Sequence, residues 1–564
     1  MNKKILIPII IILILVTGIG AYFIFQKPPV PKPPISRCGN GICEKGESVQ
    51  CPRCVYDPIN PCKVRCTEGT CPGDCKTPVN ATKTCSELNG DICSFSQACS
   101  GDWLTTSDNE KCCSEECKDS SIIPPPSPPP STGQISPFGI MAAFAPSTLT
   151  TISATDKVAW AGEKFRDLGA KWSRNVGELT IWGIIEPEFG KGYDWSGSDE
   201  VLKKAYEIGG VSFNMVVVIV PQRGKGENPD IPSDKENYYS KFVEALVERY
   251  DGDGINDYSP IIKVKYWQMT NEPFPRQWES AGGTIDGYVR FAELTHNAIK
   301  KSDPNAKIIL GTFQLEKTEE INKLKQVIPK MKNKNLFDYV DTHYWNSGNN
   351  YKIPVGEARS VLDSNGYSNA KMVALESGTW AEMRGRGTEK DQANYLIKEY
   401  AYNIAHDFLL INWNNLVEWE SFGRDTRNIY NYMGLIADGE NNDTIPAGTP
   451  RLSYYTYKKM VEILEGSDWN NIQTIQESDG IYIYKFLKNG KPIWVAWNDN
   501  SGSQSITISG ISSTQVKITE VIPKYESGKD VMDYNTAFNS YNQVSKDGKI
   551  SLVLDDVPMF VEEN

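Results

Sequence analysis

Two glutamates stand where apolar, strand-like segments stop. The segment IKVKYWQMT from Ile262 is followed by Asn271 and Glu272, and the segment AKMVALES from Ala370 contains Glu376 near its end. If both segments are strands of one parallel barrel, both carboxylates lie at its carboxyl-terminal rim. Paired carboxylates can cleave a glycosidic bond, because one protonates the leaving oxygen while the other attacks the anomeric carbon. The alternative is that both are solvated acids at strand ends.

Other hydrolytic chemistries find little support in the sequence. The chain has three histidines, at 296, 343 and 406, and their spacing is not that of a metal site. No G-x-S-x-G nucleophile elbow occurs. We therefore expect neither a metal nor a cofactor, and we interpret His296 and His406, which lie in helix-like segments, as structural.

From residue 135 onward, short apolar runs alternate with amphipathic helical segments, a pattern that predicts a parallel sheet with crossover helices. The predicted strands are FGIMAAF, KWSRNV, VSFNMVVVIV, IKVKYWQMT, AKIILGTF, FDYVDTHYW, AKMVALES and NNLVEWESF, starting at residues 138, 171, 211, 262, 306, 337, 370 and 414. Eight such units in about 330 residues suit a (β/α)8 TIM barrel, an α/β fold, over residues 137–466.

The motifs at these strand ends resemble those of clan A glycoside hydrolases. WQMTNEP is similar to the acid/base motif of this clan, and ALESGTW is similar to its nucleophile strand. The resemblance implies that Glu272 is the general acid/base, that Glu376 is the nucleophile and that Asn271 binds the sugar 2-hydroxyl. It covers about 330 residues, and the stretches IIEPEFGKGYDWS and IKKSDPNAKIILG also look like connections in families five and thirty-nine. The family within the clan stays open.

The same resemblance extends to four further positions. Arg174 ends the second predicted strand and matches the arginine that the clan places beneath its nucleophile. His343 and Tyr344 end the sixth strand and match a His and a Tyr near the nucleophile, and Trp419 ends the eighth strand, where the clan commonly has an aromatic platform for the sugar. One departure is the sequence IVPQRGKG after the third strand, where many family five enzymes carry a His-Asn pair.

The amino-terminal region predicts export and a membrane anchor. Residues 5–25 form an uncharged apolar run long enough to cross a bilayer, and Lys3 and Lys4 precede it. We expect residues 1–25 to be a single-pass signal-anchor in the cell membrane, with the catalytic domain extracellular. The alternative is a cleaved signal peptide and a secreted protein.

Cysteines occur in one region only. All 14 lie between Cys38 and Cys117, between a Pro-rich stalk (26–36) and a Pro-rich linker (119–136). Even numbers of cysteines in an exported segment predict disulfide-rich modules over residues 37–118. A hard-cation site formed by acids of the first cluster is the weaker alternative.

The final segment, residues 467–564, alternates apolar and polar positions in IYIYKFL, PIWVAWN, SITIS, VKITEV and ISLVLDD, which predicts an antiparallel β-sandwich. The net charge of −12 argues against nucleic acid as a partner, because phosphates are held by clustered Lys and Arg.

The sequence therefore predicts a retaining β-glycoside hydrolase that cleaves extracellular poly- or oligosaccharides by double displacement. Two alternatives remain open. A transglycosylase would share the glycosyl-enzyme intermediate, and a surface adhesin would bind carbohydrate on an inactive barrel.

Overall fold

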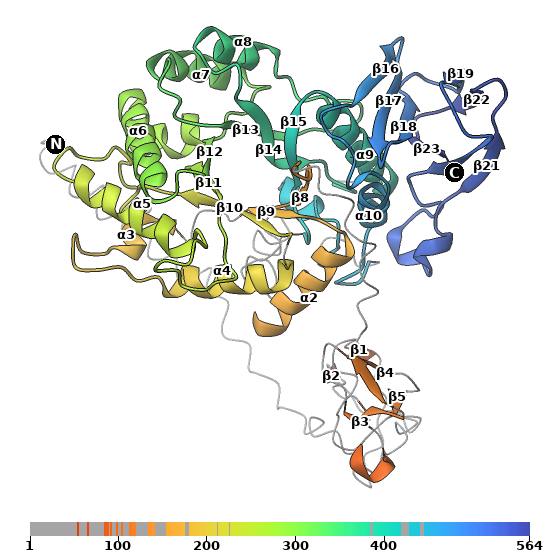
Figure 1. Ribbon diagram of the computed structural model, residues 1–564, viewed down its shortest axis with the longest axis horizontal. Coiled ribbons are helices and arrows are strands. Elements are labelled where there is room, and N and C mark those ends of the chain that lie inside the picture. The colour runs from red at the N-terminus through yellow and green to blue at the C-terminus, as the bar shows by residue number, and fades with distance from the viewer. Residues whose placement is uncertain are drawn as a thin grey trace, which may run out of the picture. The chain divides into compact units, whose positions relative to one another are not determined.

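The computed structural model describes residues 134–141, 154–174, 180–210, 212–224, 226–383, 387–418, 428–439 and 445–563, together with short segments between 54 and 119 (Figure 1). The contacts divide the chain into two units, residues 1–127 and 128–564. The predicted anchor, stalk and linker lie outside the described residues, apart from Asp119 and the last three positions of the linker. Among the described residues there is no helix of the length and apolarity that a bilayer crossing requires.

The first unit is described only in pieces. Its strands are short and antiparallel, and β1 pairs with β2, β3 and β5 pair with β6, and β4 pairs with β7. Their bounds are Cys54–Val55, Arg65–Cys66, Asp91–Ile92, Gln97–Cys99, Trp103–Leu104, Cys112–Cys113 and Cys117–Asp119, and one turn of 3-10 helix covers Ser86–Leu88. Cys85 is buried and disulfide-bonded.

The second unit contains a closed barrel of eight parallel strands in the order β8 to β15. The strands are β8 (Phe138–Ile140), β9 (Trp172–Arg174), β10 (Asn214–Ile219), β11 (Tyr266–Met269), β12 (Lys307–Leu310), β13 (Tyr339–Trp345), β14 (Lys371–Gly378) and β15 (Phe408–Trp413). The predicted (β/α)8 barrel is therefore confirmed. Six of its strands lie within the predicted segments, and β14 extends one residue past its own segment, to Gly378.

The eighth strand was predicted wrongly. Barrel closure is made by Phe408–Trp413, which pairs with β14 and with β8, whereas the predicted segment from Asn414 follows this strand. The physical reason lies at the preceding helix end, because α9 stops at Ala405 and the chain turns at Asp407, whose φ is +65°. Glycine usually marks such a turn, and an aspartate gives no comparable signal.

Helices surround the barrel and cover its apolar outer face. They are α2 (Ala154–Asp167), α3 (Trp182–Ile185), α4 (Ser196–Gly209), α5 (Glu236–Tyr250), α6 (Ile285–Ser302), α7 (Thr318–Lys330), α8 (Gly356–Ser364), α9 (Glu389–Ala405) and α10 (Leu452–Leu464). Local sequence defines some starts: the Thr388 hydroxyl accepts from the Asp391 N–H while the Asp391 carboxylate accepts from Thr388, a capping box that begins α9.

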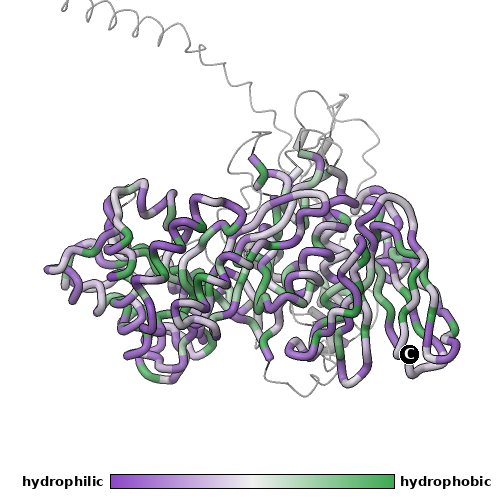
Figure 2. Tube along the Cα trace, turned by 90° about the horizontal axis from the view of Figure 1, so that it is seen from above, coloured by the Kyte–Doolittle hydropathy of each residue, from purple (hydrophilic) through white to green (hydrophobic). Residues whose placement is uncertain are grey.

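The C-terminal strands form two antiparallel sheets, as predicted. The larger sheet has the order β16 (Gln473–Ser478), β17 (Ile481–Lys488), β18 (Lys491–Asn498), β23 (Met559–Glu563), β20 (Gln515–Glu520), β21 (Ser540–Val544), and the smaller sheet pairs β19 (Gln504–Ser509) with β22 (Lys549–Leu554). Along several of these strands hydrophobic and hydrophilic segments alternate (Figure 2).

Strand β17 of the larger sheet is buried on both faces. Ile481 and Ile483 of β17 pack in the core shared with the smaller sheet, whereas Tyr482, Tyr484 and Phe486 join the core that continues into the barrel. Alternate residues of a strand point to opposite faces. Because both faces of β17 are buried, its sequence is a nearly continuous apolar run. The C-terminal sheets therefore brace the barrel.

Candidate active site

The Arg174 guanidinium connects three barrel strands, β9, β11 and β14, at their carboxyl-terminal ends. It is 1% exposed, and its Nη1 lies 2.7 Å from Glu376 Oε1. Its Nε donates to Gln268 Oε1 and its Nη2 donates to Asn271 Oδ1, both at 2.6 Å. The arginine thus neutralises the Glu376 charge and positions the residue next to Glu272.

His343 lies between the two glutamates. Its Nδ1 is 3.0 Å from Glu272 Oε1 and 3.6 Å from Glu376 Oε2, and its Nε2 is 3.2 Å from Asp341 Oδ2. The imidazole is fully buried. Strands β11, β13 and β14, which are separate in sequence, thereby bring Glu272, His343 and Glu376 into one cluster.

The backbone around Glu272 adopts rare conformations. Glu272 has a φ of +27°, and Thr270, two residues earlier, has a φ of +58°. Positive φ is unfavourable for residues with a Cβ and persists where the surroundings enforce it, often at functional sites. Here the carboxylate is held by the Gln314 Nε2 donor at 3.0 Å and by Arg276 Nη1 at 3.5 Å.

The charges in the cluster move its pKa values. Burial opposes ionisation of Glu272, but the hydrogen bond and charge of His343 outweigh it and lower the pKa of Glu272 to about 2. Burial also opposes the charge on His343, but Glu376 and Asp341 together raise the pKa of His343 to about 10. At neutral pH the proton of this pair therefore resides on the imidazole, 3.0 Å from Glu272.

Glu376 is shifted in the other direction. Burial raises its pKa, and the positive charges of His343 and Arg174 oppose that rise. The two glutamates thus have different proton affinities although both are buried, at 8% exposed for Glu272 and 6% for Glu376. In a glycosidase the general acid is the carboxyl with the raised pKa, whereas here the pKa is raised at Glu376 and lowered at Glu272.

Several polar residues of the cluster were not predicted from the sequence. Gln268 Nε2 donates to Asp341 Oδ2 at 2.8 Å, and Thr312 Oγ1 contacts both Asp341 and His343 Nε2. Gln268 and Asp341 are buried inside the barrel. Each lies on the strand face that also carries polar groups at the carboxyl-terminal rim. The available signal was the period of two, since Asp341 precedes His343 by two residues.

Two aromatic residues also border the cluster. The Trp345 ring packs against that of His343 in an edge-to-face arrangement, with centroids 5.4 Å apart, and Tyr430 packs against Trp345 at 5.8 Å. Burial and the charges of Glu376 and Glu272 raise the pKa of the Tyr430 hydroxyl, which places this residue within electrostatic reach of both glutamates. Tyr430 follows β15 and had no strand-end signal.

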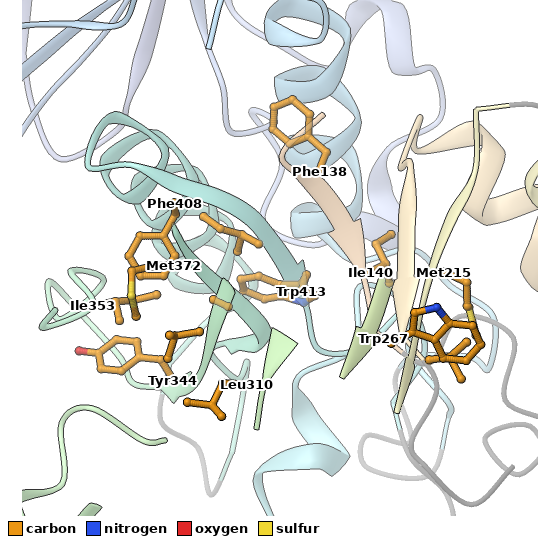
Figure 3. Close-up of a cluster of buried hydrophobic side chains, with 14 of the residues drawn as sticks. Phe138, Ile140, Met215, Trp267, Leu310, Tyr344, Ile353, Met372, Phe408 and Trp413 are labelled. Carbon is orange, nitrogen blue, oxygen red and sulfur yellow. The ribbon is translucent and has the colours of Figure 1, made fainter. Parts of the chain in front are cut away.

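Of the remaining predicted residues, Tyr344 does not join the cluster and Trp419 is not among the described residues. Tyr344 faces away from His343 into the outer hydrophobic core, where Figure 3 shows it beside Ile353, and its hydroxyl donates to the Asn350 carbonyl at 2.9 Å. Trp419 lies outside the described residues, and it does not end the eighth strand, because β15 stops at Trp413.

The remaining histidines are structural, as predicted. His296 Nδ1 contacts the Leu336 carbonyl at 3.1 Å, and His406 stacks on Tyr402 with ring centroids 4.0 Å apart. Trp278 is 2% exposed and is therefore a packing residue.

No protein-family model and no curated sequence matches this chain. Solved structures do. A family 39 glycoside hydrolase from Bacteroides cellulosilyticus WH2 is similar with a TM-score of 0.53 and 13% identity, over 76% of this chain and 81% of that one. A glucosidase from Croceicoccus marinus is similar with a TM-score of 0.51 and 12% identity, over 76% and 96% of the two chains. A conserved exported protein from Bacteroides fragilis has a TM-score of 0.50 and 15% identity, over 76% and 97%.

At these identities the similarity is one of fold. The shared architecture agrees with the eight-stranded parallel barrel described above and with the clan that the motifs at its strand ends resemble. In fold, this chain is a (β/α)8 barrel that is similar to these solved structures.

Proposed function

We propose that the protein is a retaining β-glycoside hydrolase in which Glu376 is the nucleophile and Glu272 is the acid/base. The observation that carries the proposal is that one nitrogen, His343 Nδ1, contacts both carboxylates, at 3.0 and 3.6 Å. This arrangement supports the roughly 5–5.5 Å spacing of retaining enzymes over the roughly 6.5–9.5 Å spacing of inverting enzymes, which seat a water between the carboxyls.

In the first step, Glu376 attacks the anomeric carbon and the bond to the aglycone oxygen breaks. The electron pair of that bond goes to the leaving oxygen, which takes a proton from Glu272. This proton crosses from His343 Nδ1 to Glu272 Oε1 along their 3.0 Å hydrogen bond as negative charge develops on the leaving oxygen. Arg174, 2.7 Å from Glu376, keeps the nucleophile ionised before attack.

In the second step, Glu272 takes a proton from water. The hydroxide so formed attacks the anomeric carbon, and the bond to Glu376 breaks. Forming the ester with the sugar removes the negative charge of Glu376, which lowers the proton affinity of Glu272 and leaves it ionised to act as the base. The proton that Glu272 takes from water then passes back to His343 Nδ1, and the electron pair of the broken ester bond returns to Glu376. Two inversions return the original anomeric configuration.

The test is hydrolysis of a panel of β-linked aryl glycosides and polysaccharides by the purified full-length chain. Turnover of at least one substrate with retained configuration is expected, and Glu376→Gln and Glu272→Gln should each lower kcat/KM by at least about 100-fold. Wild-type activity that survives in both variants would refute the site. Binding of glycans without turnover would favour the adhesin, and transfer to a sugar acceptor in preference to water would favour the transglycosylase.

We also propose that the enzyme works outside the cell, held by residues 5–25 in the membrane. The uncharged run and the preceding Lys3 and Lys4 support this orientation. Protease added to intact cells should remove the barrel while the first residues stay in the membrane fraction. Recovery of the whole chain from the medium would instead support a cleaved signal peptide.

A further inference from the structure

Gln314, in the segment between β12 and α7, is a second buried donor to the Glu272 carboxylate. It is 1% exposed, and its Nε2 lies 3.0 Å from Glu272 Oε1, the oxygen that is also 3.0 Å from His343 Nδ1. Among the described residues, the other oxygen of Glu272 has a single polar contact, with the exposed Arg276 Nη1 at 3.5 Å. The direction of the carboxylate is therefore fixed mainly through Oε1, by Gln314 and His343.

Lys317 determines which end of the Gln314 amide faces Glu272. Half a turn of an amide group exchanges its donor nitrogen and its acceptor oxygen, so its partners decide the orientation. Lys317 Nζ, which can only donate, contacts Gln314 Oε1. The NH2 end is thereby directed at Glu272. Without the ammonium group, the amide could turn and place its oxygen against the carboxylate instead.

The backbone of this segment is held by contacts that do not involve the Gln314 or Lys317 side chains. The Gln314 N–H donates to Glu320 Oε2 at 2.6 Å, and the Gln314 carbonyl accepts from the Lys317 N–H at 2.9 Å. The Phe313 N–H donates to the Asp341 carbonyl of β13 at 3.1 Å. Substitution of either side chain should therefore leave the path of the segment unchanged.

We infer that Lys317 is a positioning residue for the acid/base Glu272 and that it acts through the orientation of the Gln314 amide. The inference deepens the proposed glycosidase function and rests on it. Among the described residues, Lys317 forms no ion pair with Glu272, so its effect on the carboxylate passes through Gln314. A donor held on Oε1 keeps the carboxyl aimed in one direction and favours the ionised form that the second step requires.

The choice of leaving group separates the acid/base from the nucleophile. A dinitrophenolate ion is stable enough to leave without a proton, whereas a methoxyphenolate ion is a stronger base and needs one from the general acid. A residue that positions Glu272 should therefore affect hydrolysis of a methoxyphenyl glycoside far more than hydrolysis of the matching dinitrophenyl glycoside. A change that merely loosens the fold would slow both.

The test compares Gln314→Met, Lys317→Met, Lys317→Arg and the double Met variant in the full-length chain. The matched control is Lys325→Met, because Lys325 of α7 pairs with Glu357 at 3.1 Å on the surface. The sugar is the one that the wild type hydrolyses, and kcat/KM is measured for both aryl glycosides.

Gln314→Met and Lys317→Met should each lower kcat/KM for the methoxyphenyl glycoside about tenfold and keep that for the dinitrophenyl glycoside within about threefold of wild type. Lys317→Arg should restore most of the loss, since it keeps a cation that only donates. The double variant should lose no more than Gln314→Met alone. Lys325→Met should match the wild type on both substrates.

Three results would overturn the inference. One is wild-type kcat/KM for the methoxyphenyl glycoside in Lys317→Met. Another is an equal loss for both substrates in that variant, because Lys317 would then support the fold and not the acid/base. The third is additive losses in the double variant, because Lys317 would then act without Gln314.

A measurement without substrate separates this inference from the proposed function. The chain has three histidines, so the buried His343 imidazole can be assigned in spectra of histidine-labelled protein. Its Nδ1 proton shares Glu272 Oε1 with Gln314, and its resonance should move downfield in Gln314→Met and Lys317→Met but not in Lys325→Met. That shift in a protein that hydrolyses nothing would refute the enzyme and retain the positioning contact. No shift in an active enzyme would refute the inference alone.

Discussion

Arg174 is the residue on which the electrostatics of the cluster depend most directly. Its guanidinium donates to Gln268, Asn271 and Glu376, each from a different nitrogen, so no single point charge can replace it. Its removal would leave the Glu376 carboxylate buried beside Asp341 without its closest cation.

Arg174→Met should therefore lower kcat by at least about 100-fold and destabilise the fold by about 3 kcal/mol, since a buried charge loses its partner. The same change should raise the pKa of Glu376 further and move the acidic limb of the rate profile to higher pH. Steady-state kinetics against pH and urea unfolding check this prediction. Arg174→Lys, which keeps the charge, should restore the acidic limb but only part of kcat.

The pH dependence of the wild type follows from the same cluster. Activity requires Glu376 ionised, and burial raises its pKa, so the acidic limb should lie above the ordinary glutamate value of 4.5. Activity also requires the proton shared by His343 and Glu272. That proton is present below the His343 pKa of about 10 and is lost as pH rises through it, so the alkaline limb should lie near that value.

His343→Asn should move the alkaline limb to lower pH, because the Glu272 carboxyl is then the only group of the pair that can hold the proton. The measurement is kcat/KM from pH 4 to about 10.5 for both proteins, within a range where each is shown to be folded. An alkaline limb at the same pH in both proteins would contradict the proposal that the imidazole carries the shared proton before the reaction.

At the scale of elements, β8 and β15 close the barrel through a contact that tolerates only glycine. Gly139 lies opposite Asn412 in the strand register, and a Cβ at residue 139 would approach Asn412 Oδ1 to 1.7 Å and the Trp172 Cβ to 2.9 Å. The Asn412 amide has no hydrogen-bond partner in the described residues, so it is removable at small cost.

Gly139→Ala should cost about 1–3 kcal/mol through overpacking. In the double variant Gly139→Ala/Asn412→Ala the closest clash is absent, so the loss should be smaller than the sum of the two single losses. Urea unfolding of the four proteins gives the coupling free energy, and strictly additive losses would show that closure does not depend on this pair.

At the scale of the whole molecule, the barrel and the C-terminal sheets share one core and a buried ion pair. Lys398 Nζ of α9 lies 3.0 Å from Asp499 Oδ1, and the Tyr351 hydroxyl donates to Asp499 Oδ2 at 2.7 Å. Trp497 of β18 in turn donates to that hydroxyl. The two parts should therefore unfold together.

Lys398→Met should destabilise the protein by about 3 kcal/mol, because Asp499 is left largely buried without its cation. The control is Lys390→Met, which removes an exposed pair with Glu526 across the same junction and should cost less than about 1 kcal/mol. Calorimetry should show one transition for the barrel and the C-terminal sheets in each protein. Separate barrel and sheet transitions in the wild type would contradict the shared core.

The sequence by itself determined the periodic and local features. Apolar runs alternating with amphipathic helices predicted the (β/α)8 barrel and most of its strands, and the period of two predicted the C-terminal sheets. Strand-end positions also predicted Glu272 and Glu376, because the carboxyl-terminal ends of barrel strands meet at one rim. The resemblance to clan A predicted Arg174 and His343.

Only the tertiary structure decided which of these side chains meet and how. The eighth strand at 408–413 followed a helix without a glycine or proline between them, so local sequence could not separate the two. Tyr344 turned outward while Trp345 turned toward His343, and the direction of each depends on strand pairing and on the helix packed behind it. The proton affinities of Glu272 and Glu376 arise from burial and from charges brought together across four strands. These charges are far apart in the sequence, so no single stretch of it predicts their combined effect.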